Sequence, residues 1–122
     1  MADLTNLQIF KSFDQIEGGL GEAKNLIIKS PTGSGKSLGL PILLFQKKLV
    51  SGQILVVQPR RIAARSLATK AAQLTNSEMG QCIGYQVRFE NKASDKSKII
   101  YLTDGILFRK IISDRFLSRV EV

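Results

Sequence analysis

SPTGSGKS, residues 30–37, is the stretch of this chain that decides its fold. It follows Asn25 to Lys29 (NLIIK), a short apolar run typical of a buried parallel strand. A helix is expected to begin at about Lys36 and to run into the region of Lys47. Gly33 and Gly35 permit backbone conformations and close approaches that a side chain would block. Successive backbone N–H groups can therefore point inward beside the positive end of a helix, which is an anion-binding arrangement.

A strand, a glycine-rich turn, a Lys-Ser pair and a helix together form the phosphate-binding loop called Walker A. We expect nucleotide contacts from a continuous segment: Thr32, Gly33, Ser34, Gly35, Lys36, Ser37 and Leu38. Lys36 would reach the β- and γ-phosphates and is the candidate catalytic residue, and the Ser37 hydroxyl would ligate Mg²⁺. The strict pattern has glycine where this chain has Ser30, and glycine-serine turns also occur in ordinary loops. The loop predicts binding of a nucleoside triphosphate and does not say what its hydrolysis drives.

Around this loop, apolar strands alternate with helical stretches, without a linker or an internal repeat. Strands are expected at Ile54–Val57, Cys82–Val87 and Ile99–Leu102, and helices at Arg60 to about Leu74 and from Asp104 onward. An earlier helix would carry Leu4, Leu7, Phe10, Phe13 and Ile16 on one face and end at Gly18, Gly19 and Gly21. Strands separated by helices imply right-handed crossovers. We therefore predict an α/β fold with a mainly parallel sheet and flanking helices.

Composition narrows the class of protein. The 122 residues suffice for one domain, and 43% hydrophobic and 23% charged residues are ordinary for a globular chain. A net charge of +8 fits a polyanionic partner such as nucleic acid, or serves solubility alone. Cys82 is the single cysteine, so no intramolecular disulfide can form. The opening MADLTN lacks a secretory signal, and the most apolar stretch, from Leu38 to Val50, is too short and too charged to span a bilayer. We expect no membrane association and a cytoplasmic location, or a nuclear one in a eukaryote.

Four segments together resemble DEAH-box ATP-dependent RNA helicases of superfamily 2. Besides SPTGSGKS, residues 57–68 (VQPRRIAARSLA) resemble the motif Ia region, residues 83–90 (IGYQVRFE) the strand and turn after it, and residues 102–107 (LTDGIL) motif Ib. They occur in the family's order and spacing and cover nearly the whole chain from Asn25 onward. The resemblance implies that residues 1–122 are the front part of the first RecA-like domain, an incomplete P-loop NTPase fold. ATP and Mg²⁺ are the implied cofactors.

The same resemblance implies an RNA-binding surface formed by Arg60, Arg61, Arg88 and Thr103. These residues follow predicted strands, where the functional loops of parallel sheets collect. They would hold the sugar-phosphate backbone of single-stranded RNA without reading its sequence. Each of these arginines could instead form an ion pair with an acidic residue or face solvent, and the same holds for Arg65. We expect Tyr85 and Phe89 to pack in the core or in a turn rather than to stack on bases.

Two departures from the family limit what the resemblance implies. Many DEAH-box proteins have an arginine that packs on adenine where this chain has Lys70, and lysine stacks less well. The sequence also stops at Val122, before the expected Asp-Glu motif and the second RecA-like domain with its arginine fingers. We therefore expect the parent enzyme to hydrolyse ATP and the 122-residue chain to be inactive alone. A strand beside Asn25 to Lys29 would be missing, and the open edge would favour self-association.

Two alternatives to a helicase of this kind remain. One is a stand-alone nucleotide- or RNA-binding module without turnover, and the other is a fragment of a DNA-acting helicase.

Overall fold

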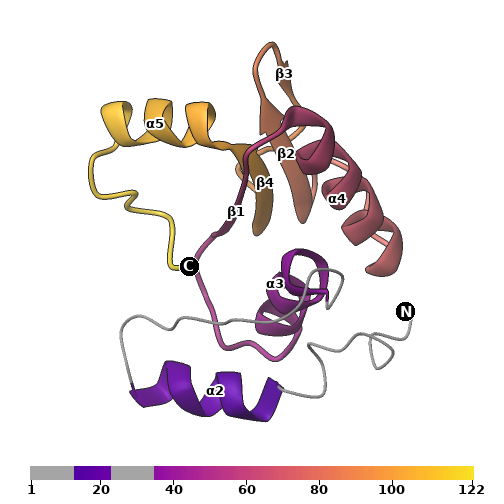
Figure 1. The fold of residues 1–122 in the computed structure, drawn as a ribbon, viewed down its shortest axis with the longest axis vertical. Coiled ribbons are helices and arrows are strands. Elements are labelled where there is room, and N and C mark those ends of the chain that lie inside the picture. Colours follow the sequence, from indigo (N-terminus) through magenta and orange to yellow (C-terminus); the bar gives the residue numbers. More distant parts are fainter. Residues whose placement is uncertain (1–12, 23–34) are drawn as a thin grey trace.

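The computed structural model describes residues 13–22 and 35–122. Its elements, shown in Figure 1, are α2 (Phe13–Glu22), α3 (Lys36–Gln46), β1 (Ile54–Gln58), α4 (Arg61–Leu74), β2 (Ile83–Val87), β3 (Glu90–Asn91), β4 (Ile99–Thr103) and α5 (Asp104–Ser113). The expected helix at Lys36 and the strands and helices expected after it are all present, with bounds that differ by at most one residue. The expected strand at Asn25 to Lys29 and residues 30–34 of the phosphate loop lie outside the described residues.

The sheet is mixed, with mostly parallel strands in the order β1-β4-β2-β3. β4 pairs in parallel with β1 on one side and with β2 on the other, and β3 is antiparallel to β2. Gln58, at the end of β1, lies opposite Thr103, at the end of β4. The carboxyl ends of β1, β4 and β2 therefore meet at one edge of the sheet, which is called the carboxyl edge below. The predicted α/β fold with a mainly parallel sheet is confirmed.

Small alanines let α4 approach the sheet closely. α4 contacts β1, β2 and β4 through one face, α3 packs against α4 and the sheet, and α5 contacts β1 and β4 from the other side (Figure 1). The buried cluster consists of Ile42, Leu43, Leu44, Ile54, Ala64, Ala68, Ala71, Ala72, Ile83, Tyr85, Val87, Ile99 and Tyr101. β4 is buried along its whole length because it lies between two strands and beneath helices. The near-continuous apolar run at Ile99–Leu102 is the signature of such a strand.

Our prediction that Gly18, Gly19 and Gly21 end the first helix is wrong. α2 runs from Phe13 to Glu22 and contains all three glycines. Glycine weakens a helix by roughly 1 kcal/mol per residue, but it adopts helical dihedrals without steric hindrance. Its presence lowers the stability of the helix without stopping it. Ile16 is buried as the helical periodicity predicts, and the segment before Phe13 lies outside the described residues.

The last residues of the chain lie along the start of β1. Gln53 and Val120 form a parallel bridge, and the Leu55 N–H donates to the Val122 carbonyl over 2.8 Å. The Glu121 carboxylate accepts hydrogen bonds from the backbone N–H groups of Ser51 and Gly52, which lowers its pKa. The expected open edge at Asn25 to Lys29 falls outside the described residues and stays a prediction. Within residues 13–22 and 35–122, no helix is long and apolar enough to cross a membrane.

A short hairpin that the sequence did not predict extends β2. Val87 pairs with Glu90, and Gln86 pairs with Asn91. The chain then returns so closely that a Cβ on Gly84 would lie 2.7 Å from the Ala93 Cα. Only glycine fits at that position without moving the backbone. The hairpin loop consists of Arg88 and Phe89, and it extends beyond the sheet at the carboxyl edge (Figure 1).

Candidate functional site

The first turn of α3 contains the described part of the phosphate loop. Gly35 is the N-cap residue and has the left-handed dihedrals φ 92° and ψ 16°. Its carbonyl accepts a hydrogen bond from the Gly39 N–H over 2.6 Å, so the helix is formed from its first residue. Lys36 and Ser37 occupy the first two helical positions, where backbone N–H groups point toward the start of the helix. A helix start of this kind can bind an anion. That Gly35, Lys36, Ser37 and Leu38 contact a nucleotide stays a prediction.

Two strands of the sheet hold Ser37 in place. The Gln58 side chain, at the end of β1, donates from Nε2 to the Ser37 Oγ over 3.4 Å. The Tyr101 hydroxyl, from β4, donates to the Ser37 carbonyl oxygen over 2.9 Å. In a regular helix that carbonyl would accept the N–H of residue 41, but residue 41 is proline and has no N–H. Tyr101 therefore supplies the hydrogen bond that Pro41 cannot.

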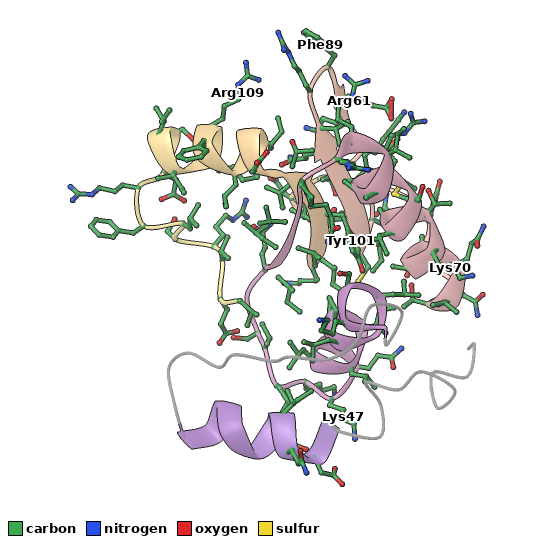
Figure 2. The ribbon with its side chains drawn as sticks, viewed as in Figure 1. Lys47, Arg61, Lys70, Phe89, Tyr101 and Arg109 are labelled. Atoms are coloured by element: carbon green, nitrogen blue, oxygen red, sulfur yellow. The ribbon has the colours of Figure 1, made fainter. Side chains whose placement is uncertain are left out.

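Tyr101 is fully buried in the centre of the sheet, and burial raises the pKa of its hydroxyl. The group therefore stays protonated and acts only as a donor toward Ser37 at neutral pH. Figure 2 shows Tyr101 in the interior, between the sheet and α3. Sequence reasoning missed both Tyr101 and Gln58 as partners of the phosphate loop. The one available signal was Pro41, because a proline inside a helix leaves a carbonyl that needs another donor.

The arginine pair of the motif Ia region lies at the carboxyl edge. Arg60 is the N-cap residue of α4, has extended dihedrals and makes no capping bond through its side chain. Arg61 is the first helical residue, and both side chains are exposed. Gln58, which contacts Ser37, lies two residues before Arg60. The structure thus brings the arginine pair and the phosphate-loop helix to the same end of β1.

Thr103 is the last residue of β4, and Arg88 lies just past the end of the neighbouring strand β2. A hollow of about 320 Å³ is lined by Arg88, Thr103, Asp104, Gly105, Ile106 and Arg109. Thr103 is the N-cap residue of α5, is only 8% exposed and makes no capping bond through its side chain. Asp104 accepts the Gly105 N–H over 2.8 Å, so this N–H is already used. Arg109 is a second cation in the hollow that sequence reasoning missed, because it lies beyond the recognised motif.

Phe89 is not packed in the core or against the hairpin, and our prediction for it is wrong. Its side chain is 89% exposed, whereas Tyr85, which we grouped with it, is buried as predicted. The Arg88 guanidinium lies over the Phe89 ring, 4.8 Å from the ring centroid. Figure 2 shows Phe89, Arg61 and Arg109 toward the same end of the molecule. The exposed aromatic ring therefore extends from the cationic carboxyl edge.

A polar network holds the base of this hairpin. The Tyr85 hydroxyl donates to the Glu90 carboxylate, and Arg65 from α4 forms an ion pair with the same carboxylate at 3.4 Å. The hydrogen bond from Tyr85, aided by the nearby Arg65 charge, lowers the pKa of Glu90. The same contact raises the pKa of Tyr85. Arg65 thus has the structural role that we left open for it.

Comparisons with known proteins agree with the motifs. The model of the DEAD/DEAH box helicase family matches residues 11–122. The chain is 40% identical over 115 residues to ATP-dependent RNA helicase DHX33 of Mus musculus, covering 93% of this chain and 16% of that protein. It is 32% identical over 117 residues to ATP-dependent RNA helicase HrpB of Escherichia coli strain K12, covering 96% of this chain and 14% of that protein.

A solved structure shows the same fold. The crystal structure of the E. coli DExH-box NTPase HrpB superposes with a TM-score of 0.89 at 32% identity. The match covers 98% of this chain and 15% of that chain. The 122 residues thus span about a sixth of the length of the relatives that they match.

Proposed function

This chain belongs to the DEAD/DEAH box helicase family, and we propose that it is the ATP-binding part of an ATP-dependent RNA helicase. The observation that carries the proposal is the contact between Gln58 and Ser37. It joins the start of the phosphate-loop helix to the end of the strand that leads into Arg60 and Arg61. A nucleotide site and a cationic surface that meet at the end of one strand are suited to couple the binding of ATP to the binding of RNA.

In the proposed nucleotide site, Lys36 places a positive charge at the β- and γ-phosphates. The first N–H groups of α3 point toward the same anion, and the positive end of the helix dipole adds to the attraction. Gly35 in the left-handed region lets the backbone turn tightly into the helix. Thr32, Gly33 and Ser34 complete the cradle in this proposal, although they lie outside the described residues.

Ser37 fits the place of a Mg²⁺ ligand. Its hydroxyl oxygen is a hard donor, and Gln58 holds it from the side of the sheet. Mg²⁺ commonly takes one or two ligands from protein and the remainder from phosphate oxygens and water. When bound, the ion would neutralise charge that develops on the phosphates during hydrolysis. The contribution of this chain is then to orient one ligand oxygen beside Lys36.

The proposed RNA-binding surface consists of Arg60, Arg61, Arg88 and Thr103. The proposal also includes Arg109, because it lines the same hollow as Arg88 and Thr103. All five lie at or just beyond the carboxyl edge, at the ends of β1, β2 and β4 or on the segments that follow them. Arginines there would contact phosphates and hold a single strand irrespective of sequence. Phosphate contacts alone do not separate RNA from DNA, so a DNA-acting helicase is the second candidate. The names of the relatives, which are RNA helicases, favour RNA.

Hydrolysis is assigned to the parent protein. The 122 residues contain no adjacent Asp-Glu pair to position the attacking water. We propose that this pair and the arginine fingers come from other parts of the parent protein, including a second RecA-like domain. The competing proposal is a module that binds nucleotide or RNA without turnover. An in-frame acidic motif and second domain in the source gene would favour the helicase.

A phosphate-release assay on the purified 122-residue chain tests this division of roles. With ATP, Mg²⁺ and single-stranded RNA present, we expect release at the rate of the buffer alone. The parent protein, assayed in parallel, is expected to release phosphate faster when RNA is added. Release from the 122-residue chain that RNA stimulates and Lys36→Ala abolishes would contradict the proposal, because the catalytic acid would then lie within these residues.

A further inference from the structure

Pro41 lies inside α3, where it removes one hydrogen bond of the helix. Proline has no N–H, and its ring crowds the carbonyl group four residues earlier, which here belongs to Ser37. The helix therefore does not fix the direction of the Ser37 carbonyl, although Ser37 is its second residue. That direction depends on a donor from another part of the fold.

Tyr101 supplies this donor from a fixed point in the sheet. Its hydroxyl lies 2.9 Å from the Ser37 carbonyl oxygen, and its side chain is fully buried. β4 lies between β1 and β2, so that Tyr101 has Val56 on one side and Tyr85 on the other. A side chain in such a close-packed interior keeps one rotamer. The position of the hydroxyl therefore decides where the Ser37 carbonyl points.

The Ser37 carbonyl and the Leu38 N–H belong to the same peptide group. Among the described residues there is no cis peptide bond, and in a planar trans peptide the C=O and the N–H point in opposite directions. A hydrogen bond that fixes the carbonyl therefore also fixes the N–H. Leu38 is the third residue of α3, so its N–H points toward the start of the helix, where the phosphates are proposed to bind.

A separate contact holds the side chain of Ser37. The Gln58 Nε2 donates to the Ser37 Oγ over 3.4 Å. A hydroxyl oxygen has two lone pairs and a proton of its own, so Ser37 can ligate a metal ion while Gln58 donates to it. The main chain and the side chain of Ser37 are thus held by different strands. Loss of the Tyr101 hydroxyl removes only the contact to the main chain.

We propose that Tyr101 is a positioning residue of the nucleotide site, which acts through the Ser37 carbonyl and aims the Leu38 N–H at the phosphates. Tyr101 lies in the core and does not itself contact the nucleotide (Figure 2). It also lies outside the four motif segments of the sequence. A donor that is already aimed strengthens binding, because the ligand does not have to order it. The inference rests on the proposed function, since it assumes a nucleotide at the start of α3.

Four forms of the 122-residue chain test the proposal: the unmodified chain, Tyr101→Phe, Pro41→Ala and the double variant. Fluorescence anisotropy of a fluorescent ATP analogue, with Mg²⁺ present, gives their affinities. Tyr101→Phe keeps the ring and removes only the hydroxyl, so binding should weaken roughly 2- to 12-fold, the contribution of one hydrogen bond. In Pro41→Ala, residue 41 regains an N–H that can hold the Ser37 carbonyl in place of Tyr101. The double variant should therefore bind as tightly as Pro41→Ala.

Tyr85→Phe is the matched control for a purely structural effect. Tyr85 lies opposite Tyr101 on β2, is also buried and also donates a hydrogen bond through its hydroxyl, in this case to Glu90. Its loss lowers stability without a change at Ser37, so the affinity for the analogue should stay the same. NMR gives a second readout. The Leu38 amide resonance should move in Tyr101→Phe and stay in place in Tyr85→Phe.

The outcomes separate this proposal from the one on which it rests. If Tyr101→Phe binds as the unmodified chain does while Lys36→Ala does not bind, the positioning role is refuted and the phosphate loop stands. Equal weakening in Tyr101→Phe and Tyr85→Phe, or equal weakening with and without Pro41, also refutes that role. Should Tyr101→Phe fail to fold, the double variant decides, because it keeps a donor for the Ser37 carbonyl: weaker binding than that of Pro41→Ala would refute the proposal. Absence of binding to the unmodified chain overturns both proposals.

Discussion

The Tyr101 hydroxyl donates to the Ser37 carbonyl oxygen over 2.9 Å, in the place of the helical hydrogen bond that Pro41 lacks. Tyr101 is fully buried in β4, the strand between β1 and β2, and Ser37 is the second residue of α3. The hydrogen bond therefore ties the start of the phosphate-loop helix to the core of the sheet. Proline at residue 41 makes this link necessary, because it removes the alternative donor.

Removal of the Tyr101 hydroxyl should destabilise the protein in a way that depends on Pro41. Tyr101→Phe leaves the partly buried Ser37 carbonyl without a donor, which should lower the free energy of unfolding by about 1–3 kcal/mol. In a Pro41→Ala background residue 41 regains its N–H, so the same substitution should cost much less. Urea unfolding of the four proteins gives the coupling. Equal costs in both backgrounds would show that the Ser37 carbonyl does not need Tyr101.

Neutralisation of Arg60, Arg61 or Arg88 should weaken RNA binding to all sequences alike. Each substitution removes about one released counterion, so the slope of log affinity against log salt should flatten by about one unit. Anisotropy titrations at several salt concentrations measure this slope. Arg115→Ala removes an exposed arginine far along the chain from these three and should leave the slope intact. An Arg88→Ala variant with altered base preference and an unchanged slope would contradict the backbone-contact role.

Lowering the pH should destabilise the folded protein, partly through protonation of Glu90. Its pKa is lowered from the ordinary value of 4.5, first by the Tyr85 hydrogen bond and then by the Arg65 charge. The stability that this carboxylate adds is therefore present above about pH 4.5 and is lost as the pH falls through the lower pKa of the folded state. Tyr85→Phe should raise the Glu90 pKa toward 4.5 and make the urea midpoint less sensitive to pH below 4.5.

Glu121 provides the internal comparison for that experiment. Its pKa is also lowered, by the backbone N–H groups of Gly52 and Ser51, and Tyr85→Phe does not touch it. Some acid sensitivity should therefore persist in the variant. NMR titration of the two side chains resolves them. A Glu90 pKa that does not move in Tyr85→Phe would show that the hydrogen bond is not the main cause of the shift.

Periodicity and glycine placement predicted most of the described elements after Gly35 because each is long enough to show a pattern. The four apolar residues of Ile99–Leu102 predict a buried strand, and they form the strand that lies between two others. β3 was not predicted because a strand of two residues is too short to show a periodic pattern. The end of α2 was predicted too early because glycine content was weighed above the permissive dihedrals of glycine.

Sequence patterns could not predict contacts between segments that are distant along the chain. Tyr101 lies 64 residues from Ser37, and nothing local marks either as the partner of the other. Phe89 follows an apolar strand, so its sequence context resembles that of a packed residue, and only the turn geometry reveals its exposure. Arg109 joins Arg88 in one hollow only because β2 and β4 are neighbours. The site residues that the sequence predicts come from motifs, whose residue types follow from phosphate chemistry.

Equilibrium binding of a fluorescent ATP analogue, with Mg²⁺ present, tests the central claim most directly. Lys98 is an exposed lysine just before β4, at the opposite edge of the sheet, and Lys98→Ala serves as the charge-matched control. We predict that Lys36→Ala abolishes binding while its urea midpoint stays close to that of the unmodified chain, and that Lys98→Ala binds normally. An unchanged affinity in Lys36→Ala would contradict the assignment of the phosphate loop and, with it, the helicase function proposed for this chain.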